Sequence, residues 1–169
     1  EKFRIAYMPP ATEFNYYIAI GEGIKAVAAD AGVEVFMLAP QSGADINGQM
    51  GMIQDVLTQD VDAIIFGTHD EFAAAPLIKK AVDKGMAVMM INSDIPNFPT
   101  PIHGVVGYSQ RNGTHNIADW AIENYGDKSV KVGIIEGQPG YHSTERVGGF
   151  LDGIKGNDNF EVVVSIDGK

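Results

Sequence analysis

Residues 86–94 of the chain read Met-Ala-Val-Met-Met-Ile-Asn-Ser-Asp, an unbroken apolar run that ends in three small polar side chains. The run is too short for a helix buried on all sides. It suits a central strand of a parallel sheet, which is covered on both faces and shows no alternation. Ligands of open parallel α/β sheets bind beyond the carboxyl ends of the strands. The polar tip Asn92-Ser93-Asp94 therefore either faces a binding site or only begins a turn, where these residue types are common.

Strand-like segments alternate with segments of helical periodicity along the whole chain. The expected strands are residues 3–8, 33–38, 61–66, 86–91, 102–107, 130–136 and 160–166. The expected helices are about 17–31, 45–58, 71–84, 110–125 and one more after the turn 137–140. Such alternation predicts an α/β protein with a Rossmann-like parallel sheet, right-handed crossovers and helices on both faces.

Several residues within these helices have an expected place. Gly32 and Gly85 are expected to end the first and third helices. The residues expected to point inward from the first helix are Tyr17, Ile20, Ile24, Val27, Ala28 and Ala31. Those expected inward from 110–125 are Ile117 and Ala121, with Trp120 as a further candidate. Gly21 and Gly23 lie inside the first helix and are expected to let it approach the sheet closely.

A proline-rich segment, residues 95–101 (Ile-Pro-Asn-Phe-Pro-Thr-Pro), interrupts the pattern. Proline at this density is incompatible with a helix or a central strand, and it makes a stiff, extended connection. We therefore expect the chain to cross here between two lobes. Residues 1–101 are expected to form an N-terminal lobe and residues 102–169 part of a C-terminal lobe.

The composition excludes several classes of function. A net charge of −10 argues against a nucleic-acid partner, because phosphate neutralisation needs clustered Lys and Arg. The absence of cysteine excludes disulfides, a thiol nucleophile and a Cys-based zinc site. No apolar stretch approaches the ~20 residues needed to span a bilayer. The chain begins at a strand-like segment without a signal peptide, so an exported protein would have this as its mature form.

Enzymatic signatures are also missing. The first strand is followed by Pro9-Pro10-Ala11-Thr12-Glu13, which contains no glycine-rich phosphate loop. The four histidines show no metal-binding spacing, and no serine lies in a nucleophile elbow. His69 and Asp70 could form an acid/base pair, but neighbours in sequence rarely face each other, so hydrogen-bonding roles are favoured. We expect neither a catalytic residue nor a cofactor nor a metal.

The expected strand tips carry aromatic rings and planar hydrogen-bonding groups. They are Glu13 to Tyr17 after the first strand, Thr68 to Asp70 after the third, Asn92 to Asp94 after the fourth, and Tyr141, His142 and Arg146 beyond the proline-rich segment. A neutral polyol such as a sugar needs this mixture, because its C–H faces stack on rings and each hydroxyl both donates and accepts. Alternatively, Tyr16 and Tyr17 are core residues, Arg146 is solvated and Asp70 caps a helix.

The chain resembles the periplasmic sugar-binding proteins of ABC transporters, in the ribose/galactose-type branch. The stretches that carry the resemblance are Asn15-Tyr-Tyr with Gly23, the Asp70 turn, Ile91-Asn-Ser-Asp94, Val106-Gly-Tyr-Ser-Gln110 and Arg146-Val-Gly-Gly-Phe150. The resemblance implies a type I periplasmic-binding-protein fold, a location in the periplasm and an ABC transporter permease as partner. It implies ligand contacts from Phe14, Asn15, Tyr16, Tyr17, Asp70, Asn92, Asp94, Tyr141 and Arg146, with the tyrosines as a ring-sandwiching pair.

Two departures from the family accompany this resemblance. Asn92 replaces an Asp that is frequent in the family, and Ser109-Gln110 replaces the more usual Asp-Asn. The chain is also short, with an incomplete second lobe, so we expect an N-terminal fragment, a proteolysed product or one part of a larger assembly. The same scaffold serves as the effector domain of LacI-type repressors, which leaves effector sensing by a transcription regulator as the alternative function.

Overall fold

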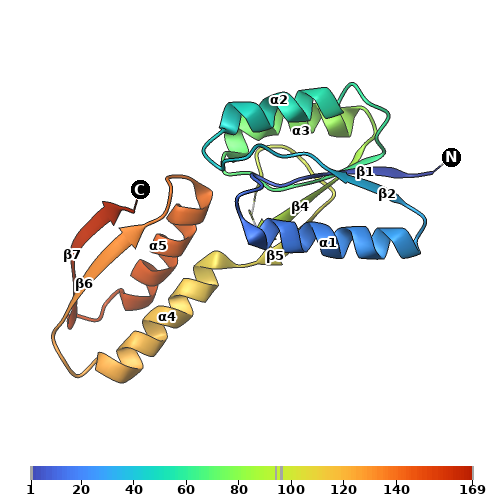
Figure 1. Ribbon diagram of the computed structural model, residues 1–169. Coiled ribbons are helices and arrows are strands. Elements are labelled where there is room, and N and C mark those ends of the chain that lie inside the picture. The colour runs from blue at the N-terminus through green and yellow to red at the C-terminus, as the bar shows by residue number, and fades with distance from the viewer. Residues whose placement is uncertain (1, 94, 96, 169) are drawn as a thin grey trace. The chain divides into compact units, whose positions relative to one another are not determined.

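The computed structural model (Figure 1) describes residues 2–93, 95 and 97–168, and the chain divides into two compact units, Glu1–Gly107 and Tyr108–Lys169. The elements of the first unit are β1 (Arg4–Met8), α1 (Asn15–Asp30), β2 (Glu34–Met37), α2 (Ile46–Val56), β3 (Ala63–Phe66), α3 (Glu71–Asp83), β4 (Ala87–Ser93) and β5 (Gly104–Tyr108).

The first unit is built on one sheet with the strand order β2-β1-β3-β4-β5. The pairs β1–β2, β1–β3 and β3–β4 are parallel, and Ile5 of β1 lies between Val35 and Ala63 in the register. Figure 1 shows α1 on one face of this sheet and α2 with α3 on the other. The predicted α/β class, with a parallel sheet and helices on both faces, is confirmed.

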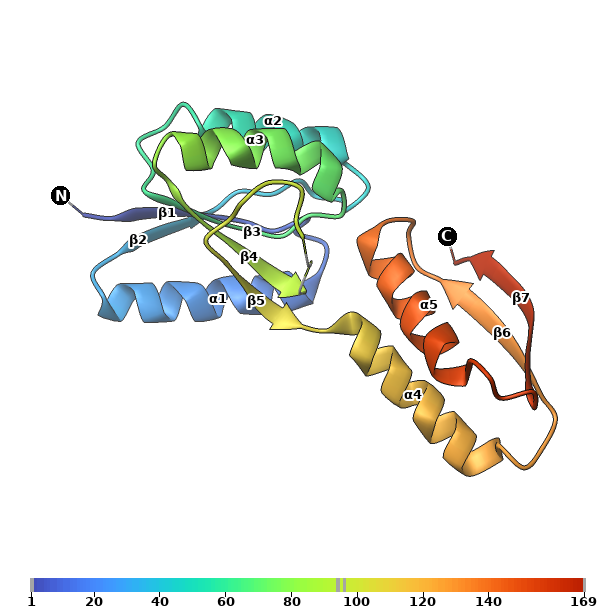
Figure 2. The same ribbon diagram turned by 180° about the vertical axis from the view of Figure 1, so that it is seen from behind.

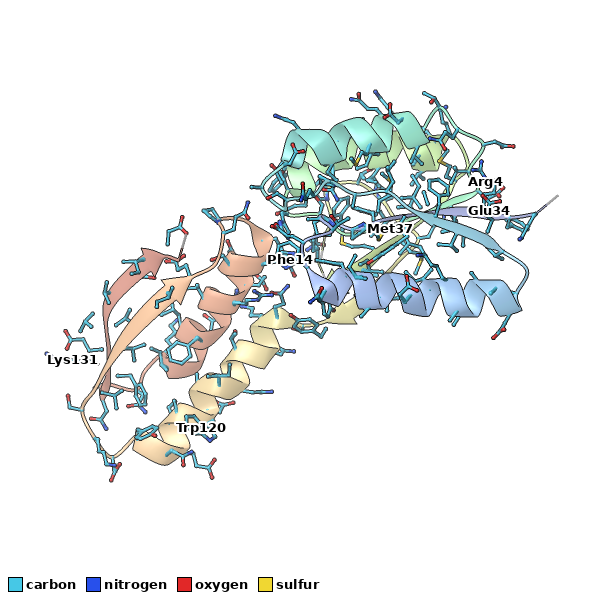
Figure 3. All side chains as sticks on the ribbon, viewed as in Figure 1. Arg4, Phe14, Glu34, Met37, Trp120 and Lys131 are labelled. Carbon is cyan, nitrogen blue, oxygen red and sulfur yellow. The ribbon has the colours of Figure 1, made fainter. Side chains whose placement is uncertain are left out.

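The core of the first unit lies on both faces of the central strands. Tyr7, Ile64, Phe66 and Val88 are fully buried. The apolar run of residues 86–91 supplies β4, where Val88 and Met90 are at most 1% exposed, which confirms a buried central strand. Figure 3 shows Arg4 and Glu34 together at the start of β1 and β2. Their ion pair, Arg4 Nε–Glu34 Oε1 at 3.3 Å, links the edge strand β2 to β1.

The glycines of the first unit behave mostly as predicted. Gly32 and Gly85 follow helices with φ angles of 70° and 85°, a left-handed conformation that glycine adopts without strain. A Cβ on Gly21 would lie 2.9 Å from Tyr7 Cε1, so this glycine does allow α1 to approach the sheet. The same prediction is wrong for Gly23, which faces open space. Val27 is 72% exposed and not inward, since it lies on the solvent side of α1.

The assignment of residues 102–107 to the C-terminal lobe is wrong, because β5 is the edge strand of the first sheet. The His103 backbone N–H donates to Val88 O at 2.9 Å, and the Val88 N–H donates to His103 Nδ1 at 3.0 Å. These bonds dock the chain beside β4 directly after the proline-rich segment. That segment therefore connects two strands of one sheet, and the compact units divide after Gly107 instead of after Pro101.

The second unit contains α4 (Gln110–Tyr125), β6 (Val130–Glu136), α5 (Tyr141–Ile154) and β7 (Phe160–Asp167). The strands β6 and β7 are parallel, with an irregularity between Val132 and Gly133. Figure 2 shows α4 and α5 side by side along this pair of strands. Within the described residues 108–168 the sheet of this unit has two strands, as expected for an incomplete second lobe.

The face of α4 that packs is not the predicted one. Ile117 and Trp120 are 55% and 56% exposed, and Figure 3 shows Trp120 on α4. The buried positions of α4 are Gln110 and Ala118, two turns apart on the face toward α5. Within the described part of the chain, no helix combines the length and the apolarity that a bilayer crossing requires.

Candidate functional site

The loops that follow β1 and β2 are joined at the carboxyl edge of the first sheet. The backbone N–H of Thr12 donates to Pro40 O at 2.9 Å, and that of Glu13 donates to Gln41 O at 3.2 Å. The Glu13 carboxylate accepts the backbone N–H of Gly43 at 2.7 Å. Glu13 is one of the strand-tip residues proposed from the sequence, and in the structure its carboxylate joins the two loops through this hydrogen bond.

Aromatic rings form a contiguous row at this edge. Phe14, labelled at the start of α1 in Figure 3, contacts the Tyr17 ring edge-on at a centroid distance of 6.1 Å and the His69 ring at 5.8 Å. The Tyr16 and Tyr17 rings are 5.2 Å apart. The structure therefore brings together the predicted residues of α1 with the loop that follows β3.

The three rings of α1 differ in accessibility. Phe14 is 38% exposed and Tyr16 is 51% exposed, whereas Tyr17 is 4% exposed. Tyr17 packs with Tyr7 and Ile91 in one buried cluster. Of the predicted pair Tyr16 and Tyr17, Tyr16 is about half exposed and Tyr17 is buried. Asn15, the first residue of α1, is exposed.

Two hydrogen bonds link the buried tyrosine to the sheet. Tyr7 Oη donates to the Tyr17 backbone carbonyl at 2.8 Å, and burial raises the pKa of Tyr7 above its ordinary value, so its hydroxyl remains a donor. Asn92 Nδ2 donates to Tyr17 Oη at 2.7 Å. The tip of β4 is thereby tied to α1, as its position at the carboxyl edge suggested. Asp94, the other predicted residue of this tip, lies outside the described residues.

Asn92 has a backbone conformation that few residue types adopt. Its φ angle is 90°, and Asn is one of the non-glycine residues that tolerate positive φ. Strained backbone of this kind persists only where surrounding structure holds it, and it gathers at ligand sites. Here the bond to Tyr17 holds the side chain.

His69 and Asp70 do not form an acid/base pair. His69 Nδ1 lies 3.1 Å from Gly43 O, and Asp70 Oδ1 accepts the backbone N–H of Ala73 at 2.8 Å. Asp70 is therefore the N-cap of α3, which is the alternative that the sequence left open for it. His69 has the hydrogen-bonding role that the sequence favoured.

Two residues of this edge were not identified from the sequence. Gly43 lies so close to its neighbours that a Cβ would be 2.7 Å from His69 Cε1 and 2.9 Å from Phe14 Cε2. Gln49 is buried on α2, and its Nε2 donates to Pro9 O at 3.1 Å and to Gly67 O at 2.7 Å, which ties the ends of β1 and β3. Gly43 follows a strand, where a glycine only weakly indicates a functional turn. Gln49 lies within a helix, where its sequence context does not reveal that it is buried.

The second unit carries its predicted residues on the first turns of α5. The Tyr141 and His142 rings lie 5.7 Å apart, and Gln110 Nε2 contacts His142 Nδ1. Arg146 is exposed, and within the described residues it forms no hydrogen bond or ion pair. Arg146 therefore lies on the solvated face of its helix and keeps all its donors available.

A second arginine of this unit is fully engaged. Arg111 pairs with Glu145 at 3.3 Å and with Asp152 at 2.5 Å. The hydrogen bond with Asp152 raises the pKa of Arg111 above its ordinary value. Arg111 thus links α4 to α5, whereas Arg146 has no comparable structural task.

The N-termini of α1 and α5 differ from those of the other three helices in side-chain capping. Asp45, Asp70 and Ser109 cap α2, α3 and α4 through their side chains. Among the described residues, no side chain caps α1 or α5, whose N-cap residues are Phe14 and Gly140. The first-turn N–H groups of α1 and α5 are therefore not satisfied by a capping side chain of the described residues.

A groove of about 430 Å³ lies elsewhere in the first unit, between α2 and α3. It is lined by Gln54, Leu57, Thr58, Leu77, Lys80, Asp83 and Lys84, at the carboxyl ends of both helices. Helices of a parallel α/β sheet run opposite to its strands, so this groove lies at the edge away from the strand tips. Residues 2–93, 95 and 97–168 contain no group of three or more His, Asp or Glu side chains that could hold a metal ion.

Comparisons with known proteins find a matching family model and curated relatives. A family model described as periplasmic binding protein domain matches residues 5–169. The D-ribose/D-allose-binding protein of Pseudomonas aeruginosa is 27% identical over 161 residues, which cover 90% of this chain and 50% of that protein. The ribose import binding protein RbsB of Bacillus subtilis is 26% identical over 151 residues, covering 89% of this chain and 48% of that protein.

The fold also matches solved structures. The crystal structure of a Caulobacter myo-inositol binding protein bound to myo-inositol is 25% identical, with a TM-score of 0.85. The match covers 99% of this chain and 56% of that one. The chain thus spans about half the length of the curated relatives that it matches.

Proposed function

The chain belongs to the periplasmic binding protein domain family, and from this premise we propose that the whole protein is a receptor that captures a sugar or sugar-like polyol between two lobes. The receptor delivers this ligand to the permease of an ABC transporter. It works in the periplasm as an exported protein, and it is neither an enzyme nor a nucleic-acid-binding protein.

The observation that carries this proposal is the set of groups at the carboxyl edge of the first sheet. The Phe14 and Tyr16 rings are partly exposed, and the Asn92 amide lies in the same cluster through Tyr17. Aromatic faces take up the C–H surfaces of a sugar ring, and an amide both donates to and accepts from hydroxyls. The combination suits a neutral polyhydroxylated ring.

The names of the relatives support the same chemical class. Ribose, allose and myo-inositol are neutral molecules with hydroxyl groups on neighbouring carbons. The residues proposed to contact the ligand are Phe14, Asn15, Tyr16, Asp70, Asn92 and Asp94 in the first unit and Tyr141 and Arg146 in the second. Since Ala73 occupies Asp70 Oδ1, the role of Asp70 rests on its other carboxylate oxygen.

Hinge closure converts such binding into a signal. A ligand that engages groups of both units favours the closed arrangement, because only that arrangement makes both sets of contacts. The permease then receives a surface that the open protein does not present. Arg146, charged in any surroundings and rich in donors, supplies the strongest contact of the second unit.

Two arginines of the second unit provide a matched test. Binding of D-ribose, D-allose and myo-inositol to the whole protein is measured by isothermal titration calorimetry. Arg146→Ala is expected to weaken the tightest of these interactions by at least ~2 kcal/mol, about thirtyfold, the scale of a lost charged hydrogen bond. Asp94→Ala should act similarly. Arg111→Ala, which removes an arginine already paired with Glu145 and Asp152, should change the affinity less than about threefold.

Unchanged affinity in both Arg146→Ala and Asp94→Ala would refute the proposed site. Failure of the unsubstituted protein to bind any neutral sugar or polyol would refute the proposed function itself.

A further inference from the structure

We propose that Tyr17 is a positioning residue that orients the amide of Asn92 toward the ligand, while the stacking faces are those of Phe14 and Tyr16. This inference rests on the proposed sugar-binding function. It gives different roles to two neighbouring tyrosines that the family resemblance assigns to one ring-sandwiching pair.

The first step is the difference in burial between the two tyrosines. Successive residues of a helix point about 100° apart, since 3.6 residues make a turn. Tyr17 shares its face of α1 with Gly21 and Ala28, which are buried, whereas Tyr16 is 51% exposed. The Phe14 and Tyr16 rings each contact the Tyr17 ring in a T-shaped arrangement. A ligand that stacks on this cluster therefore meets Phe14 and Tyr16.

The second step is the bond that the buried ring makes. Asn92 Nδ2 donates to Tyr17 Oη at 2.7 Å. An amide has two N–H donors and one carbonyl acceptor, and this bond uses one donor. Among the described residues, Asn92 Oδ1 has no hydrogen-bond partner. The bond thus fixes which way the amide faces and leaves Oδ1 and the second N–H for a ligand.

The third step is the rigidity of this arrangement. Tyr7 Oη donates to the Tyr17 carbonyl at 2.8 Å, so β1 holds the turn of α1 that carries Tyr17. Tyr7, Tyr17 and Ile91 form one buried cluster, and Ile91 directly precedes Asn92. Asn92 itself has a φ angle of 90°, which few residue types other than glycine and asparagine tolerate. Three elements therefore hold one amide in place.

This arrangement narrows the class of ligand. An amide that offers one acceptor and one donor matches two hydroxyls on neighbouring carbons, one donating and one accepting. A carboxylate at residue 92 would offer acceptors alone. The Asn92 amide held by Tyr17 therefore favours a neutral vicinal diol whose ring packs on Phe14 and Tyr16.

A double-mutant cycle tests the positioning role in the whole protein. The affinities for D-ribose, D-allose and myo-inositol are measured for Tyr17→Phe, Asn92→Ala and the double variant. Tyr17→Phe keeps the ring and removes only the hydroxyl, and it should weaken binding about tenfold. In the Asn92→Ala background the same change should have less than about a twofold effect, because the residue acts through Asn92. Tyr125→Phe, the same change at a tyrosine of α4, serves as the control and should bind normally.

The outcomes separate this inference from the function on which it rests. If the two losses multiply while the unsubstituted protein binds, Tyr17 touches the ligand directly and only this inference is overturned. If the unsubstituted protein binds none of the three probes, the proposed function and this inference both fall. A ligand-free measurement adds an independent arm. Tyr17→Phe should shift the Asn92 side-chain amide signals in NMR spectra, and unshifted signals would overturn the inference.

Discussion

The two units of the chain differ most clearly in the burial of one strand isoleucine from each. Ile64 of β3 is fully buried between helices on both faces of a five-stranded sheet. Ile135 of β6 is 76% exposed in a sheet of two strands. The first unit has a core of its own, whereas the second is an open layer. The difference shows that a strand side chain is buried only where further layers cover both faces of its sheet.

The second unit is held together chiefly by its two helices. Gly149 allows α5 to lie directly against the backbone of α4, and Arg111 bridges the same helices through Glu145 and Asp152. The strand β7 contributes little burial, since Val163 and Ile166 are 50% and 52% exposed. Exposed side chains on an edge strand favour pairing with another strand.

The largest expected effect contrasts these two isoleucines. Ile64→Ala should lower the free energy of unfolding by about 2–5 kcal/mol, because it removes buried methyl groups and leaves a cavity. Ile135→Ala makes the same change at an exposed residue and should alter stability by about 0.5 kcal/mol or less. Urea unfolding of the 169-residue chain measures both. Equal losses would show that β6 is as well covered as β3.

A pair of helix glycines gives the next largest contrast. In Gly149→Ala the new Cβ would lie 2.2 Å from Arg111 O, so α4 and α5 must separate. We expect a destabilisation of about 1–3 kcal/mol. In Gly23→Ala the new methyl meets nothing within 4 Å, and the higher helix propensity of alanine should stabilise α1 by up to about 1 kcal/mol.

Hydrogen exchange locates these two effects. Gly149→Ala should accelerate exchange in α4 and α5 while leaving β1 and β3 unchanged. Faster exchange throughout both units would contradict the division of the chain into two separately packed units.

Two buried hydroxyls give a smaller contrast. Tyr7 Oη is bonded to the Tyr17 carbonyl, whereas Ser143 Oγ on α5 has no partner among the described residues. Tyr7→Phe should destabilise the first unit by about 0.5–1.5 kcal/mol, because a formed bond is lost. Ser143→Ala should be neutral or slightly stabilising, because an unsatisfied hydroxyl is removed. Thermal unfolding of both variants gives the signs, and a destabilised Ser143→Ala would show that this hydroxyl is bonded.

The same tyrosine predicts a dependence on alkaline pH. The pKa of Tyr7 is raised above its ordinary value of 10.0 by burial, so the folded protein keeps this proton where the unfolded chain loses it. Its contribution to stability is complete below that ordinary value and declines as the pH rises above it. Between pH 10 and 12, unfolding by urea should therefore show a steeper loss of stability for the unsubstituted protein than for Tyr7→Phe. Parallel losses would contradict a protected hydroxyl.

The order of elements could be predicted from the sequence because the signals are local. Apolar runs, helical spacing and the terminal glycines Gly32 and Gly85 each act within one element. The lobe to which β5 belongs could not be predicted, because the same strand pattern pairs equally well with either sheet. The prediction that Ile117 and Trp120 point inward was wrong for a related reason. An apolar helix face is buried only where another layer of the structure covers it.

The clustering of the candidate residues of the first unit could be predicted from the sequence, but most of their contacts could not. Carboxyl ends of parallel strands share one edge, so Phe14 and Asn92 could be expected near each other. The inward position of Tyr17 follows from its helical spacing with Ile24 and Ala28. Gly43 and Gln49 contact loops that are distant in sequence, so no pattern of neighbouring residues predicts these contacts. Asp70 illustrates a residue type whose capping and binding roles look alike in a sequence.

Ligand-dependent thermal stability tests the central claim, that the protein is a receptor for a neutral sugar or polyol, most directly. A ligand that binds only the native state raises its stability by RT ln(1 + [L]/Kd), about 2.7 kcal/mol at a hundredfold excess over Kd. The whole protein should therefore show a melting temperature that rises with the concentration of at least one pentose, hexose or cyclic polyol. A melting temperature unchanged by every such compound at millimolar concentration would contradict the account.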